Sequence, residues 1–124
     1  MSYEVMLRYG ERSAEVPPHL EGITSLDHRR DSEGNICFGN NRAELNFTSN
    51  YSGLLNDYLH RNGLDWLHGK KAALTIERLE YAIEQLGTEK DEDPWKPTMG
   101  NVGHALSILL EWARIHPDAI WKVF

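Results

Sequence analysis

Cysteine and long apolar runs are what this sequence most clearly lacks. A single cysteine, Cys37, occurs in 124 residues, so an internal disulfide is excluded and a reducing compartment is expected. The longest apolar runs cover only a few residues, far short of the roughly 20 that a membrane-spanning helix needs. The first residues carry neither the basic segment nor the apolar segment of a secretion signal. We therefore expect a cytoplasmic protein with no membrane contact.

Clusters of basic residues are also missing. Arg29-Arg30 and Lys70-Lys71 are isolated pairs, and the formal net charge is −6. Nucleic-acid binding depends on clustered lysine and arginine, so we expect no direct contact with nucleic acid. An acidic surface is suited to a basic protein partner, although the charge is equally explained by solubility alone.

Length and composition are those of one globular domain. Of the 124 residues, 40% are hydrophobic and 26% are charged, which is sufficient for a single buried core. The pattern divides this domain into three parts. Residues 1–48 are mostly strand and loop, residues 49–117 are helical, and residues 119–124 form a terminal strand.

Alternation of apolar and polar residues predicts the strands. It runs through residues 3–9, which predicts a strand ended by Gly10. The polar residues 11–35 are expected to form a long loop with a turn near Gly34. Residues 36–47 are expected to form a hairpin.

Apolar residues spaced three and four apart predict three helices, over residues 51–61, 70–86 and 98–116. Ser49 and Asn50 can cap the first helix, because their side-chain oxygens accept free N–H groups of its first turn. We expect an α+β fold in which a small antiparallel sheet, made of an N-terminal strand, a hairpin and a C-terminal strand, is covered on one face by three helices.

An acidic segment between the second and third helices is the first candidate site. It contains Glu89, Asp91, Glu92 and Asp93, which could imitate spaced phosphates or hold a cation. They lack the ligand order of a calcium loop, and the alternative is a solvated linker. Trp95, next to them, is the best candidate for an exposed binding anchor.

The start of the third helix is the second candidate. Asn101, Gly103 and His104 lie where free backbone N–H groups could hold a phosphate. Neither a Gly-x-Gly-x-x-Gly pattern nor a Gly-Lys-Ser/Thr pattern supports this interpretation. The alternative is that Gly103 permits close packing and that His104 lies on the rim.

Metal and catalytic signals are weak. Asp57 and His60 are three residues apart, as are Asp65 and His68, and this spacing can place two ligands on one helical face. No His-Glu-x-x-His or paired Cys-x-x-Cys accompanies them, and Cys37 in an apolar triplet is typical of a small buried residue. We predict no metal, no cofactor and no catalytic residue, and we favour a non-enzymatic role.

The segment Asn46-Phe47-Thr48-Ser49-Asn50-Tyr51 resembles an Asn-Tyr-Thr-Ser-Asn-Val segment in a loose family of small phage and bacterial proteins. The similarity extends over residues 43–124, through Leu67-His68-Gly69-Lys70 and His116-Pro117-Asp118-Ala119. This sequence departs from the family with Phe47 and Tyr51. The family has no established activity.

A shorter likeness lies in the same place. Residues 46–54 are similar to an Asn-Tyr-Thr-Ser-Ser-Tyr-Ser-Asp-Leu stretch in the anti-CRISPR inhibitors of type II-C Cas9 nucleases. This resemblance implies a mobile-element protein that binds a Cas nuclease in a bacterial host, with acidic side chains competing for the surface that reads DNA. The contact residues would be Asn46, Ser49, Asn50, Glu89, Asp91, Glu92, Asp93 and Trp95.

Three functions therefore follow from the sequence. The first is a non-enzymatic protein-binding protein that blocks host defence. The second is a small-molecule or nucleotide-binding protein that uses Asn101, Gly103 and His104. The third is an interaction module that dimerises through an edge strand, and the sequence leaves the oligomeric state open.

Overall fold

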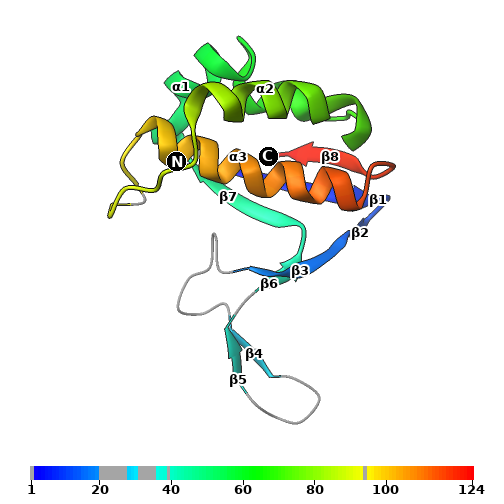
Figure 1. The fold of residues 1–124 in the computed structure, drawn as a ribbon. Coiled ribbons are helices and arrows are strands. Elements are labelled where there is room, and N and C mark those ends of the chain that lie inside the picture. The colour runs from blue at the N-terminus through cyan, green and yellow to red at the C-terminus, as the bar shows by residue number, and fades with distance from the viewer. Residues whose placement is uncertain (1, 20–27, 31–35, 39, 94) are drawn as a thin grey trace.

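The computed structural model describes residues 2–19, 28–30, 36–38, 40–93 and 95–124 (Figure 1). It confirms the α+β class, because a small antiparallel sheet packs against helices. Within these ranges, no helix combines the length and the apolar character needed to cross a membrane.

The main sheet has four strands arranged around β1 (Ser2–Tyr9). β1 pairs antiparallel with β2 (Arg12–Ser13), β7 (Glu44–Thr48) and β8 (Ile120–Val123). The predicted N-terminal and C-terminal strands are thus confirmed, and they are direct neighbours although they lie at opposite ends of the chain.

Backbone hydrogen bonds show which edge of β1 each strand occupies. The N–H of Leu7 donates to the Ala43 carbonyl (2.9 Å), and the Leu7 carbonyl accepts from the N–H of Ala14 (2.8 Å). Because both backbone groups of a strand residue point to the same edge, β7 and β2 share one edge of β1. Glu4 exchanges two hydrogen bonds with Phe124 (2.8 and 2.9 Å), so β8 lies at the other edge.

The prediction of a hairpin over residues 36–47 is wrong. Its first half, β5 (Ile36–Phe38), pairs with β4 (His28–Arg30), and its second half, β7, pairs with β1. Between them, β6 (Asn40–Arg42) pairs with β3 (Glu15–His19). Alternation of residue types indicates a strand but not its partner, which depends on distant segments.

The predicted loop over residues 11–35 is also wrong in part, because β2, β3 and β4 lie within it. These strands contain Pro17, Pro18 and charged residues and show no clean alternation, so the period-2 signal that marks a half-buried strand is absent. The predicted turn near Gly34 and the side chain of Cys37 lie outside the described residues.

The helical elements in chain order are η1 (Ser49–Tyr51), α1 (Ser52–Tyr58), η2 (Gly63–Leu67), η3 (Ala72–Thr75), α2 (Ile76–Leu86) and α3 (Met99–Ile115). The three predicted helices are confirmed, although the first two begin as 3₁₀ turns. The first cap differs from the prediction: Thr48 Oγ1 accepts from the N–H of Asn50 (3.2 Å), so Thr48 replaces Ser49 and Asn50 as the capping residue. α3 lies against the sheet, and α2 packs along α3 (Figure 1).

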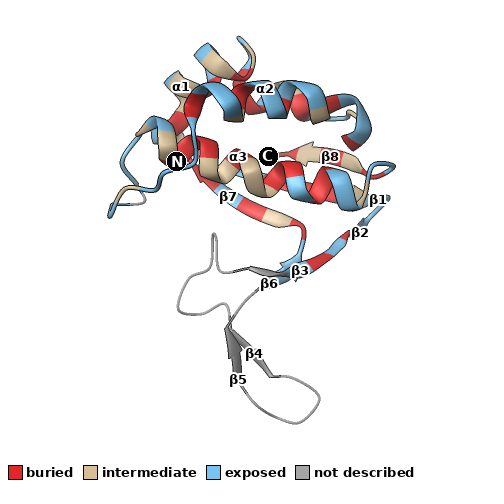
Figure 2. Ribbon diagram, viewed as in Figure 1, coloured by how far each residue is buried: buried red, intermediate tan, exposed pale blue. Residues whose placement is uncertain are grey.

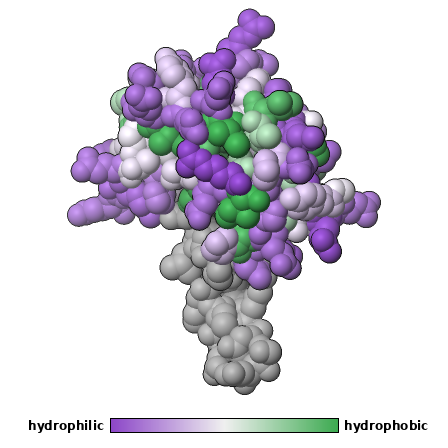
Figure 3. Space-filling view, turned by 45° about the vertical axis from the view of Figure 1, so that its right-hand side comes forward, coloured by the Kyte–Doolittle hydropathy of each residue, from purple (hydrophilic) through white to green (hydrophobic). Residues whose placement is uncertain are grey.

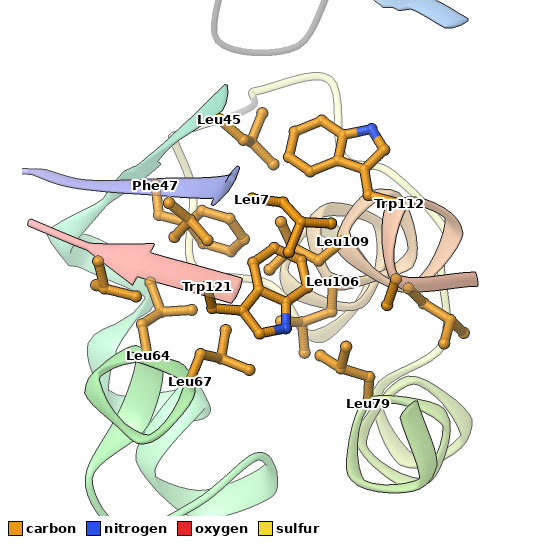
Figure 4. Packing of buried hydrophobic residues seen from close by; sticks show 14 of the residues in the cluster. Leu7, Leu45, Phe47, Leu64, Leu67, Leu79, Leu106, Leu109, Trp112 and Trp121 are labelled. Carbon is orange, nitrogen blue, oxygen red and sulfur yellow. The ribbon is translucent and has the colours of Figure 1, made fainter. Parts of the chain in front are cut away.

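The core fills the space between the sheet and these helices (Figures 2 and 4). Leu7, Phe47 and Trp121 extend into it from three adjacent strands and meet Leu106 and Leu109 of α3. Trp121 is fully buried, and its Nε1–H donates to Thr75 Oγ1 (2.9 Å). A buried indole therefore keeps its one polar group satisfied.

The outer edge of β8 is covered by the chain between η2 and η3. The N–H of Gly69 donates to the Trp121 carbonyl (2.8 Å), and the N–H of Trp121 donates to the Lys70 carbonyl (3.0 Å). His68 Nδ1 accepts from the N–H of Val123 at the same edge (3.0 Å), so this segment satisfies backbone groups of both Trp121 and Val123.

Candidate functional site

The acidic loop, residues 88–97, connects α2 to α3 and extends from one end of the helical layer (Figure 1). Glu89, Glu92 and Asp93 are exposed, and Asp91 is half-buried. The Trp95 side chain is 63% exposed, although an indole is one of the costliest groups to leave in water. The structure thus places the predicted acidic residues and the predicted anchor on one solvent-facing loop.

Asn101, in the first turn of α3, holds this loop in place. It is 4% exposed. Its Oδ1 accepts from the N–H of Asp91 (2.8 Å), and its Nδ2 donates to the carbonyls of Asp93 (3.0 Å) and Lys96 (2.9 Å). The backbone N–H of Asn101 donates to Oγ1 of Thr98, the N-cap of α3 (3.1 Å). One buried amide thus fixes three points of the acidic loop.

Two of the carboxylates also shape the loop. Asp91 Oδ1 accepts from the N–H of Asp93 (2.9 Å), and Asp93 Oδ1 accepts from the N–H of Trp95 (3.0 Å). These are successive Asx turns, in which an aspartate bonds to the backbone two residues later. Asp91 and Asp93 therefore set the conformation of the loop, whereas Glu89 and Glu92 make no such bond to any residue that the structure describes and contribute charge.

Glycines let the loop lie directly against α3. A Cβ on Gly100 would stand 1.8 Å from the Glu89 carbonyl oxygen, and a Cβ on Gly103 would stand 1.7 Å from that of Gly87. The close-packing alternative for Gly103 is thus confirmed. The start of α3, considered above as a phosphate site, has backbone carbonyls of the protein packed against it. His104 is half-buried beside it.

The junction between β7 and α1, residues 49–51, here called the hinge, contacts the same loop. Asn50 Nδ2 donates to the Trp95 carbonyl (3.1 Å), so two segments 45 residues apart are joined. Ser49 is half-buried. Asn46 is exposed on β7, where its Nδ2 donates to Ser2 Oγ (3.2 Å). The predicted contact residues of the hinge and of the loop therefore lie in neighbouring parts of the structure.

Sequence reasoning missed a group of cationic residues around Trp66, called here the Trp66 cluster. The His60 ring stacks on the indole with a centroid distance of 5.5 Å and an interplanar angle of 18°. Lys70 Nζ lies 5.0 Å and Arg78 Cζ 6.0 Å from the centroid of a Trp66 ring. Trp66 belongs to η2 and Arg78 to α2, whereas His60 and Lys70 lie in the segments on either side of η2, so no single periodic pattern reveals the cluster.

The charges of the Trp66 cluster act on its histidine. Partial burial lowers the pKa of His60 below its ordinary value of 6.5, and the nearby cations Arg78, Arg61 and Lys70 lower it further. Both effects disfavour the imidazolium form. Its Nδ1 accepts from the N–H of Asn62 (3.1 Å), which also requires an unprotonated nitrogen.

The described residues offer little support for a metal site or for a small-molecule pocket. Among the described residues, no three His, Cys, Asp or Glu side chains are grouped so that they could hold a metal ion. The cavity between α1 and η2 has a volume of about 70 Å³, whereas ligand pockets usually exceed about 300 Å³. A larger hollow of about 570 Å³ beside β2 is wide open and lined by polar and charged residues. On the face in Figure 3, apolar patches are interrupted by hydrophilic side chains.

Comparison with known proteins provides no relative: no protein-family model, no curated protein and no solved structure matches the chain. The likeness of residues 46–54 to anti-CRISPR inhibitors therefore stays a prediction from the sequence.

Proposed function

We propose that the protein is a non-enzymatic binding protein whose acidic loop contacts a basic surface of another protein. The observation that carries this proposal is the fixation of the loop by Asn101, through three hydrogen bonds of 2.8–3.0 Å. A loop ordered before binding loses less conformational entropy on association. Solvated linkers need no such buried support.

Trp95 supports the same function. It is 63% exposed, and its backbone is held on both sides, because its N–H donates to Asp93 and its carbonyl accepts from Asn50. Tryptophan is enriched among the residues that dominate binding energy at interfaces. A fixed tryptophan beside carboxylates suits a partner surface that combines an apolar pocket with lysine or arginine.

The partner class comes from the resemblance of residues 46–54. A Cas nuclease holds nucleic acid in a positively charged channel, and an acidic loop is complementary to such a channel. We propose that this protein binds a Cas nuclease or a similar host-defence protein in the bacterial cytoplasm and competes there with DNA.

Binding to a panel of purified type II-C Cas9 proteins, followed by biolayer interferometry, tests the proposal. The double variant Glu89→Lys/Glu92→Lys reverses two charges whose side chains make no Asx-type hydrogen bond within the described part of the loop. We expect on the order of tenfold weaker binding and a smaller dependence of affinity on salt. The matched control is Glu77→Lys/Glu84→Lys on α2, which makes the same change in net charge at two exposed residues.

A second pair of variants separates charge from loop shape. Asp91→Asn and Asp93→Asn remove charge but keep an oxygen that can accept the Asx-turn hydrogen bonds. The proposal predicts weaker binding with an unchanged melting temperature.

Equal losses of affinity in the loop variants and in the α2 control, or no binding to any Cas9, would overturn the proposed function. A nucleotide or metal that raises the melting temperature would instead support the ligand-binding alternative.

A further inference from the structure

One edge of the main sheet has no strand beside it in the described part of the chain. β7 pairs with β1 in a register that places Leu45 opposite Val5 and Phe47 opposite Tyr3. The hydrogen bond from Leu7 to Ala43 sets the phase of this ladder, so Leu45 and Phe47 direct their backbone groups toward β1. The N–H and carbonyl of Asn46 consequently point to the opposite edge.

The backbone of Asn46 has no hydrogen-bonding partner there among the described residues, and Asn46 is exposed. The outer edge of β8 is different, because Gly69 and Lys70 cover it. Unpaired donors and acceptors on an edge strand form a template for another extended chain. β7 contains neither a proline nor a bulge that would block such pairing.

The open edge leads directly to the acidic loop. Two residues after the end of β7, Asn50 donates to the Trp95 carbonyl. A chain that pairs with β7 would therefore approach Trp95, and with it the acidic loop, at one end. Charge complementarity then favours lysine or arginine in that chain. A second copy of this protein fits less well, because each copy carries a net charge of −6.

We propose that β7 accepts an extended, basic segment of the partner protein as an added strand, with paired hydrogen bonds to the backbone of Asn46. This inference rests on the proposed function and specifies how the partner is held. In strand addition, backbone hydrogen bonds provide affinity and flanking side chains provide specificity. The Asn46 backbone supplies the hydrogen bonds, and the acidic loop supplies the preference for a basic chain.

The probe is a capped heptapeptide of alternating lysine and valine, with an alternating glutamate and valine peptide as control. Amide chemical shifts and hydrogen exchange of the wild-type protein are measured with each peptide. We expect the basic peptide to shift the Asn46 amide and to slow its exchange at least tenfold at saturation, and the acidic peptide to do neither. Shifts confined to the acidic loop, or no shift at all, would overturn the inference.

Asn46→Pro removes the outward N–H while leaving the hydrogen bonds of Leu45 and Phe47 to β1 in place, and proline is tolerated on edge strands. Asn46→Ala keeps the N–H and removes only the side chain. We expect the proline variant to bind the peptide at least fivefold more weakly than the alanine variant, with the Phe47 amide still protected in both. Equal binding by the two variants would overturn the inference.

Two further outcomes distinguish this inference from the proposed function. Cas9 binding that is weakened by Glu89→Lys/Glu92→Lys but equal in the two Asn46 variants would contradict strand addition and leave the proposed function standing. An Asn46 amide that shifts with protein concentration alone, together with a dimer in analytical ultracentrifugation, would assign the edge to a second copy and overturn the basic segment.

Discussion

The acidic loop and the Trp66 cluster are two charged surfaces of opposite sign, and they are built differently. Buried Asn101 holds the backbone of the acidic loop by directed hydrogen bonds of 2.8–3.0 Å. In the Trp66 cluster, Lys70 and Arg78 lie 5.0 and 6.0 Å from an indole centroid, and Lys70 Nζ also donates a hydrogen bond to the Trp66 carbonyl (2.5 Å). Hydrogen bonds depend steeply on direction, whereas a cation over a ring is held by a broader attraction.

This difference suggests different uses. A surface whose backbone is fixed presents its carboxylates in one arrangement and is suited to specific recognition. Long cationic side chains that lie along an indole cover apolar area while their charges stay in water. We interpret the Trp66 cluster as packing of α2 against η2 and the acidic loop as the recognition surface. The following substitutions test this contrast.

Gly103→Ala should have the largest effect. Its new Cβ would stand 1.7 Å from the Gly87 carbonyl oxygen, so the backbone at the start of the acidic loop has to move. We expect the free energy of unfolding to fall by about 3 kcal/mol in urea denaturation. Gly53→Ala in α1 is the matched control, because its Cβ meets nothing within 4 Å, and it should raise stability by about 0.5 kcal/mol. Equal effects would contradict the close packing.

Asn101→Ala should have the next largest effect. It leaves the N–H of Asp91 and the carbonyls of Asp93 and Lys96 without the side chain that now binds them. Because the loop partly faces water, we expect a loss of about 2 kcal/mol in the free energy of unfolding. Hydrogen exchange of the Asp91 amide should accelerate while that of the Leu109 amide stays slow. A loop amide that keeps its protection would show that Asn101 does not hold the loop.

Trp66→Ala should cost less, because Trp66 is half-buried. We expect about 1.5 kcal/mol, less than the value typical of a fully buried tryptophan. The acidic loop should keep its amide exchange rates, because the side chains that hold it, Asn101, Asp91 and Asp93, do not belong to this cluster. A change in the Asp91 amide would show that the two surfaces are coupled, and the contrast between them would fail.

Local features of the fold could be predicted from the sequence, whereas pairings between distant segments could not. The α3 helix (Met99–Ile115) could be predicted, because helical periodicity is a property of neighbouring residues. Its apolar stripe consists of Val102, Leu106, Leu109, Leu110 and Ala113. Ile36–Phe38 shows the opposite case: its strand character was predicted, but its partner is β4. The residue pattern alone contains no signal that distinguishes β4 from β7 as the partner.

In the candidate site, too, local properties could be predicted from the sequence, whereas contacts between distant residues could not. The exposure of Glu89, Glu92, Asp93 and Trp95 agrees with the sequence-based prediction, whereas Asp91 is half-buried. Asn101 was a candidate ligand-binding residue, and its side chain supports the loop. Its role depends on backbone groups of Asp91, Asp93 and Lys96, and backbone groups leave no trace in side-chain patterns. The Trp66 cluster was missed because Arg78 approaches the indole only where α2 lies beside η2, 12 residues further along the chain.

The smallest expected effect is the change in the pKa of His60 when Arg78 is replaced, and it tests whether Arg78 belongs to the Trp66 cluster. Partial burial, followed by the charge of Arg78, lowers this pKa below 6.5. Arg78→Gln should therefore raise the His60 pKa in an NMR titration, but leave it below 6.5 because burial against Trp66 remains. Lys96→Gln in the acidic loop removes a cation elsewhere and should leave it unchanged.

The sign of the pH dependence follows from the same shift. Because the folded protein binds the His60 proton less readily than the unfolded chain, stability from this residue is complete above about pH 6.5. That stability is lost as the pH falls through the lowered pKa of the folded state. Arg78→Gln should narrow the pH range between the His60 pKa of the folded state and that of the unfolded chain, as measured by urea denaturation between pH 5 and pH 7. A His60 pKa that stays fixed in Arg78→Gln would mean that the charge of Arg78 does not act on the imidazole, and Arg78 would then lie too far from the indole to belong to the cluster in solution.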